Sequence, residues 1–200
     1  ILEVSRGDGY ARVVLGSSVP LEAVEKQLTA LGVEGYEVSD GVARLRWSDA
    51  EVVIDGSRIE CRYSSEEGIE RLIDVLRAVY RWWLCVGCRA CEANCPMNAF
   101  SVVEVDGRPR PMVTEPELCI KCGMCLRNCP VAEVFVEHVV APLVFDDPEA
   151  WRRPTREHNI EVMKKAKKLV QQLGAAPARG SEAPKGYADA SGFFSMLEEG

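Results

Sequence analysis

Eight of the nine cysteines in this chain fall into two runs that repeat each other at an interval of 34 residues. The first run reads Cys85-Val-Gly-Cys88-Arg-Ala-Cys91-Glu-Ala-Asn-Cys95-Pro96, and the second reads Cys119-Ile-Lys-Cys122-Gly-Met-Cys125-Leu-Arg-Asn-Cys129-Pro130. In both runs, three cysteines stand at three-residue steps, a fourth follows four residues later, and a proline comes directly after it. An internal repeat of this kind predicts two copies of one small metal-binding unit.

The spacing favours iron–sulfur clusters over disulfides and over zinc. The N-terminus shows no basic and apolar segments of a secretion signal, so many cysteines indicate metal ligands before disulfides. Structural zinc usually takes two Cys-x2-Cys pairs separated by a dozen or more residues, and it remains the rival interpretation. A run of three cysteines followed by Cys-Pro is instead the pattern of [4Fe–4S] ligation. Neither run has a gap or an Asp at a ligand position, so we expect two cubane clusters.

Residues 84–140 resemble a bacterial-type dicluster ferredoxin, and the resemblance includes both Cys-Pro terminations. In that family the fourth cysteine of each run binds the cluster of the other run. The resemblance implies one-electron transfer at low potential and two interleaved ligand sets. These are Cys85, Cys88, Cys91 and Cys129 for the first cluster, and Cys119, Cys122, Cys125 and Cys95 for the second.

The order of segments is similar to the C-terminal region of archaeal phosphoadenosine phosphosulfate reductase-like proteins. There, too, a helix runs into a ferredoxin-type cysteine run, with an α+β domain before it and a basic helix after it. The resemblance implies that the chain relays electrons to a redox partner protein or to an upstream reductase domain. The sequence itself shows no P-loop and no nucleophile or acid–base constellation, so we assign no catalytic residue.

The predicted fold class is α+β: a small antiparallel-sheet α+β domain, then the dicluster ferredoxin-like domain, then a C-terminal helical extension. Residues 1–83 form the first domain. Runs rich in β-forming residues, separated by turn signals, predict its strands. These are Tyr10–Leu15, Tyr36–Ser39, Val42–Trp47, Glu51–Asp55 and Arg58–Tyr63. In the ferredoxin domain, Asp106-Gly107 predicts a hairpin after the apolar run Ala99–Val105.

Two helices complete the first domain. One is predicted from a cap at Ser18 to a stop at Gly32. The other covers residues 66–83 and begins with the capping-box pair Ser64 and Glu67. Its wide apolar stripe matches a helix that packs on a sheet. Because it leads directly into the first cysteine run, we expect a packed interface between the two halves.

Residues 141–173 are predicted to be an extension with a helix from about Arg156 to Leu173, and residues 174–200 a linker and docking tail. One face of that helix carries Lys164, Lys165, Lys167 and Lys168. Such a face is usually solvated, yet it would also suit an acidic partner. The alternative function is therefore a structural iron–sulfur module that binds RNA or protein through this helix.

Net charge and composition limit the classes of protein to which the chain can belong. The formal net charge of −7 argues against a general nucleic-acid-binding protein. The apolar runs are far shorter than the roughly 20 residues of a membrane span, so we expect no membrane segment and a cytoplasmic location. Asn and Gln are scarce, which hints at a thermophilic source. The chain lacks an initiator Met and begins in a strand-like segment, as a processed chain or part of a longer polypeptide would.

We assign no function to the ninth cysteine or to the two histidines. Cys61 alternates with Ile59 and Tyr63, which favours a buried core thiol over a reactive one. His138 and His158 lie outside any ligand spacing and are expected to be ordinary residues.

Overall fold

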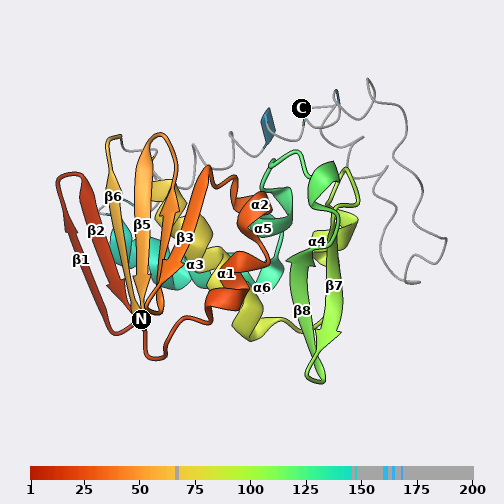
Figure 1. Ribbon diagram of the computed structural model, residues 1–200, viewed down its shortest axis with the longest axis horizontal. Coiled ribbons are helices and arrows are strands. Elements are labelled where there is room, and N and C mark those ends of the chain that lie inside the picture. Colours follow the sequence, from red (N-terminus) through yellow and green to blue (C-terminus); the bar gives the residue numbers. More distant parts are fainter. Residues whose placement is uncertain (66–67, 146, 148–159, 162–163, 165–167, 169–200) are drawn as a thin grey trace.

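The structure is a computed structural model that describes residues 1–65, 68–145, 147, 160–161, 164 and 168. It belongs to the predicted α+β class, because a six-stranded antiparallel sheet is packed against helices and followed by a two-stranded hairpin. Figure 1 shows the sheet at one end of the molecule and the hairpin at the other, with helices between them. Within the described part, no helix is long and apolar enough to cross a membrane.

The large sheet has the strand order β1-β2-β6-β5-β4-β3. Its strands are β1 (Glu3–Gly7), β2 (Tyr10–Val14), β3 (Gly35–Ser39), β4 (Val42–Arg46), β5 (Ala50–Asp55) and β6 (Arg58–Tyr63). Ile59 and Cys61 of β6 are fully buried, whereas the flanking Arg58 and Arg62 are exposed. One face of the sheet therefore forms the core and the other is charged, which is why alternation located most strands to within a residue. Strand β1, at the sheet edge, adds to the predicted set.

The helix predicted over 18–32 is interrupted. It consists of α1 (Leu21–Glu25) and α2 (Leu28–Leu31), and the backbone leaves the helical conformation at Gln27, with φ −124°. Pro20, and not Ser18, precedes the first helix, so the predicted cap is wrong. The predicted stop is confirmed, because Gly32 adopts the left-handed conformation with φ 69°.

Helix α3 (Ile69–Leu84) is buried along nearly its whole length. It contacts β5 and β6 on one side, and α5 (Met124–Arg127) and α6 (Pro130–Phe135) on another. All residues from Leu72 to Trp82 are buried. The expected packed interface is therefore present, and α3 forms it by contacting both halves of the chain.

One member of the capping box predicted at the start of this helix, Ser64, bonds the backbone of another segment. Gly68 is the N-cap of α3, and the Ser64 hydroxyl donates a hydrogen bond to the carbonyl oxygen of Asp49 at 3.3 Å. Glu67 lies outside the described residues. A Cβ atom at Gly68 would stand 2.8 Å from that same Asp49 oxygen, so the close approach of the two segments requires glycine here.

The cysteine-rich half contains short elements. They are α4 (Ala90–Ala93), β7 (Phe100–Val105), β8 (Arg108–Val113), the 3₁₀ turn η2 (Pro116–Leu118), α5, α6, the π-helical segment η3 (Val136–Val140) and α7 (Ala141–Val144). The predicted hairpin is confirmed, since β7 and β8 pair around Asp106 and Gly107. Of the predicted C-terminal helix, Ile160, Glu161, Lys164 and Lys168 are helical, and the rest of 156–173 and the tail 174–200 lie outside the described residues.

A buried ion network joins α3 to the cysteine-rich half. Asp74, 4% exposed, accepts hydrogen bonds from Arg77 at 2.9 Å and from Arg127 at 3.2 Å. Arg77, which is fully buried, also donates to Glu133 of α6. Burial alone would raise the pKa of Asp74, but the guanidinium groups of Arg127 and Arg77 hold it below its usual value. Asp74 is therefore charged at neutral pH and neutralises cations from both halves.

Replacing Asp74 by Asn should lower the free energy of unfolding by about 3 kcal/mol, because the buried guanidinium of Arg77 and the partly buried one of Arg127 lose their shared carboxylate. The matched control is Asp55→Asn, which removes the exposed 3.8 Å pair with Arg58 and should cost less than about 1 kcal/mol. Anaerobic urea denaturation followed by circular dichroism measures both. Equal, small changes would show that the buried network stabilises no more than a surface pair.

Candidate metal centre

The two cysteine runs fold in the same way. Positive φ angles occur at Gly87 (72°) and Arg89 (59°) in the first run. They recur 34 residues later at Lys121 (56°) and Gly123 (69°). These left-handed positions turn the backbone between successive cysteines, and in each run the second of them precedes a short helix, α4 or α5. The sequence repeat is thus a structural repeat.

The two copies end alike and then diverge. In α4 the side-chain amide of Asn94 donates to the carbonyl oxygen of Ala90 at 2.8 Å, and in α5 Asn128 donates to Met124 at 3.0 Å. After the first copy the chain forms the β7–β8 hairpin. After the second, Pro130 stands at the first position of α6, where its missing N–H costs no helical hydrogen bond. The second apolar run is therefore helical and packs on α3.

The eight thiols gather in two groups. Electrostatic interactions link Cys91 to Cys85, Cys88 and Cys129. They also link Cys95 to three thiols of the second run, namely Cys119, Cys122 and Cys125. Each group thus combines three cysteines of one run with the last cysteine of the other. This is the grouping that the predicted ligand sets require.

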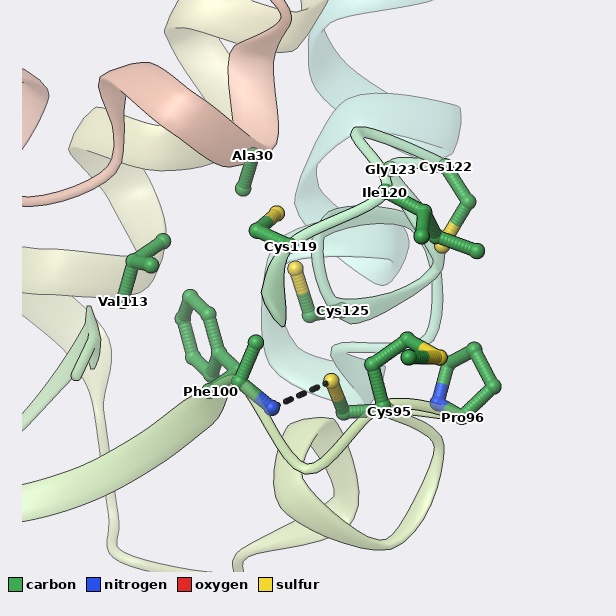
Figure 2. Close-up of a pocket in the computed structure, with 12 residues that line it drawn as sticks. Ala30, Cys95, Pro96, Phe100, Val113, Cys119, Ile120, Cys122, Gly123 and Cys125 are labelled. Atoms are coloured by element: carbon green, nitrogen blue, oxygen red, sulfur yellow. Dashed lines mark hydrogen bonds between the residues drawn. The ribbon is translucent and has the colours of Figure 1, made fainter. Parts of the chain in front are cut away.

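Figure 2 shows the second group around a cavity that also includes Pro96 and Phe100 in its wall. The side chains that line the cavity are apolar or carry sulfur. The backbone N–H of Ala99 donates to the Cys95 sulfur at 3.2 Å, the dashed line in the figure. The N–H of Met124 makes a hydrogen bond of the same kind to Cys122. Such bonds stabilise a thiolate and tune the potential of an iron–sulfur cluster.

Burial opposes charge on these thiols, although the Arg81 guanidinium lies near Cys91 and Cys125. Burial raises the pKa of Cys91 to about 11 and that of Cys125 to about 12. Neighbouring thiolates add mutual repulsion, so the donor set suits a group that supplies positive charge. In the described part, no three His, Cys, Asp or Glu side chains are arranged as ligands of a single ion. In a cubane each thiolate binds a different iron, and sulfurs spaced around a cavity fit that group.

Sequence reasoning missed the charged residues that α3 carries toward this site. Asp74, Arg77 and Arg81 are spaced i, i+3 and i+7, which places them on one side of the helix. In a helix covering one face of a sheet, that side would be exposed to solvent. All three are buried because the cysteine-rich half covers it. The spacing of these three charged residues was visible in the sequence. Their burial depends on a contact with the cysteine-rich half, which no local pattern predicts.

The other residues considered from sequence lie away from the site or outside the description. Cys61 is fully buried under the large sheet, and burial raises its pKa to about 12, as expected of an inert core thiol. His138 is exposed on η3. Lys164 and Lys168 are exposed helical residues, while Lys165, Lys167 and His158 lie outside the described residues.

Residues 84–132 match the family described as the 4Fe-4S dicluster domain. This match covers about a quarter of the chain. No curated protein and no solved structure matches the chain. The segment is thus a ferredoxin-type dicluster segment. The chain carries two [4Fe–4S] clusters, and their role is iron–sulfur electron transfer.

Paired cysteine replacements test the interleaved ligand sets. The double variant Cys91→Ala/Cys129→Ala removes two predicted ligands of one cluster and should retain about four irons per chain. Cys125→Ala/Cys129→Ala removes one ligand from each and should lose nearly all iron. All three cysteines are buried, at 6–8% exposure, so the two variants create comparable cavities.

Iron analysis of anaerobically purified protein measures this outcome, with Cys61→Ala as a control that should keep about eight irons. The reverse pattern, with four irons left in Cys125→Ala/Cys129→Ala, would show that each run binds its own cluster.

Proposed function

We propose that this chain is a dedicated electron relay that passes single electrons from a low-potential donor to a partner reductase. Each predicted cluster would be held by the ligand set described above, and the clusters, when bound, supply one-electron chemistry. The chain's own residues bind the iron, exclude water on one side and hydrogen-bond the sulfurs. The observation that carries the proposal is the gathering of eight thiols from two backbone repeats into two adjoining groups.

Each thiol group combines buried and accessible members. Cys91, Cys125 and Cys129 are buried, whereas the remaining five are partly exposed. Exposed apolar side chains lie beside the accessible ones in sequence: Val86 is 69% exposed next to Cys85, and Leu118 is 37% exposed next to Cys119. Partly exposed ligands with a small apolar margin suit the brief, small contacts of electron-transfer partners.

The proposal also includes the class of the redox partner. The order of segments resembles the C-terminal region of phosphoadenosine phosphosulfate reductase-like proteins, so a reductase of that class is the first to test. The reductase active site would lie on a separate protein or on an upstream part of a longer polypeptide. Oxidoreductase, cytoplasmic and thermophilic character are expectations of the same proposal.

Anaerobically purified protein should contain about eight irons per chain and little zinc. On addition of dithionite it should show the EPR signals of reduced cubane clusters, because partly exposed ligands make the clusters accessible to a small reductant. Metal analysis and low-temperature EPR measure the two results.

Two outcomes would contradict the relay. Stoichiometric zinc with iron near zero would show that the cysteines bind structural zinc and not iron–sulfur clusters. Clusters that dithionite cannot reduce, together with salt-sensitive RNA binding, would favour the structural module that grips a macromolecule through the basic helix.

A further inference from the structure

Arg81 of α3 is a buried cation, and no carboxylate among the described residues pairs with it. Its side chain is 1% exposed. By contrast, Arg77 and Arg127 at the same interface both have Asp74 as a partner. Among the described residues the Nε atom of Arg81 has no hydrogen-bond partner either. An unpaired buried charge is strongly unfavourable, so its retention requires an explanation.

Neutral groups fix the position of this guanidinium. Nη2 donates to the side-chain oxygen of Gln27, and Nη1 donates to the carbonyl oxygen of Cys125. The guanidinium also lies over the ring of Phe100, 4.6 Å from its centroid. Gln27 is itself fully buried and held by two hydrogen bonds that its amide donates, to Ala23 at 2.5 Å and to Ala78 at 3.2 Å. The cation is thus held rigidly by α3 and by the break between α1 and α2.

This position is shared by the two thiol groups. Arg81 interacts electrostatically with Cys91 and Cys129, which belong to the first group, and with Cys125 of the second. These three are the buried members of the eight. In a low-dielectric setting such interactions are far stronger than between exposed charges. A [4Fe–4S] cluster with its four thiolates carries net negative charge, and reduction by one electron increases it.

We propose that Arg81 is a shared counter-charge for both clusters, and that the N-terminal α+β domain holds it between them. This inference deepens the proposed electron relay and rests on it. One electron from the donor enters a cluster, and the fixed cation stabilises the negative charge that this electron adds. Arg81 is therefore a positioning residue for charge, and it raises the reduction potentials of both clusters.

Removing the charge at Arg81 in the anaerobically purified 200-residue chain tests this inference. Arg81→Met keeps a long apolar side chain without charge, and it should lower the equilibrium constant for reduction of each cluster about tenfold, a shift of 59 mV to more negative potential. Arg81→Lys keeps the charge and should stay close to the wild type. The control Arg58→Gln removes an arginine charge that is 52% exposed and lies on β6 outside the cysteine runs, and should shift neither potential appreciably.

EPR-monitored redox titration with dithionite and mediators measures both potentials without any partner protein. Unchanged potentials in Arg81→Met with full iron content would overturn the inference while leaving the relay intact. A shift in one cluster alone would overturn the shared role. If Arg81→Met fails to take up iron, rescue by Arg81→Lys supports the charge, and failure of both assigns Arg81 to hydrogen bonding instead. A wild type without reducible clusters would overturn the relay and this inference together.

Discussion

Helix α3 is the constraint on which the rest of the structure depends, because it is buried from both sides. Its apolar stripe packs on β5 and β6, and its other side packs on α5 and α6. A helix of one domain normally exposes a polar face to water. Here that face is covered, so the hydrophobic core is continuous from Val13 in the large sheet to Leu126 beside the second cysteine run. The cysteine-rich half is a packed continuation of the α+β domain.

Because the cysteine-rich half covers the polar face of α3, the charged residues on that face are buried. Asp74 neutralises the arginines that reach it from both halves, which makes the interface specific as well as stable. Arg81 lacks such a partner among the described residues and points its charge at buried thiols. Burial disfavours the thiolate form of Cys125 although Arg81 is near, so the positive charge of the cluster irons and the packing of the two halves stabilise each other. Iron loss should therefore disturb the interface as well as the site.

Local sequence patterns predicted the features that depend on interactions between residues close in sequence. The strand Arg58–Tyr63 follows from alternation, the hairpin turn from Asp106-Gly107, and the two cysteine groups from a repeat that a known family shares. Long-range contacts decided the rest. The helix break at Gln27 accompanies a hydrogen bond from its buried side-chain amide to the carbonyl oxygen of Ala78 in α3, and Arg81 is buried because a second half covers it. Neither contact has a signature within a short window of sequence.

The two copies of the cysteine run continue differently after their last cysteine, so the two sides of the metal site differ. The first copy continues into the hairpin, which Figure 1 shows on the side away from the large sheet, and the second continues into α6 against α3. The buried thiols Cys91, Cys125 and Cys129 are the ones on which Arg81 acts, so they lie toward α3. The other five thiols are partly exposed. An electron carrier needs such an outer side for exchange, and here the α+β domain supplies a dry inner side with a fixed positive charge.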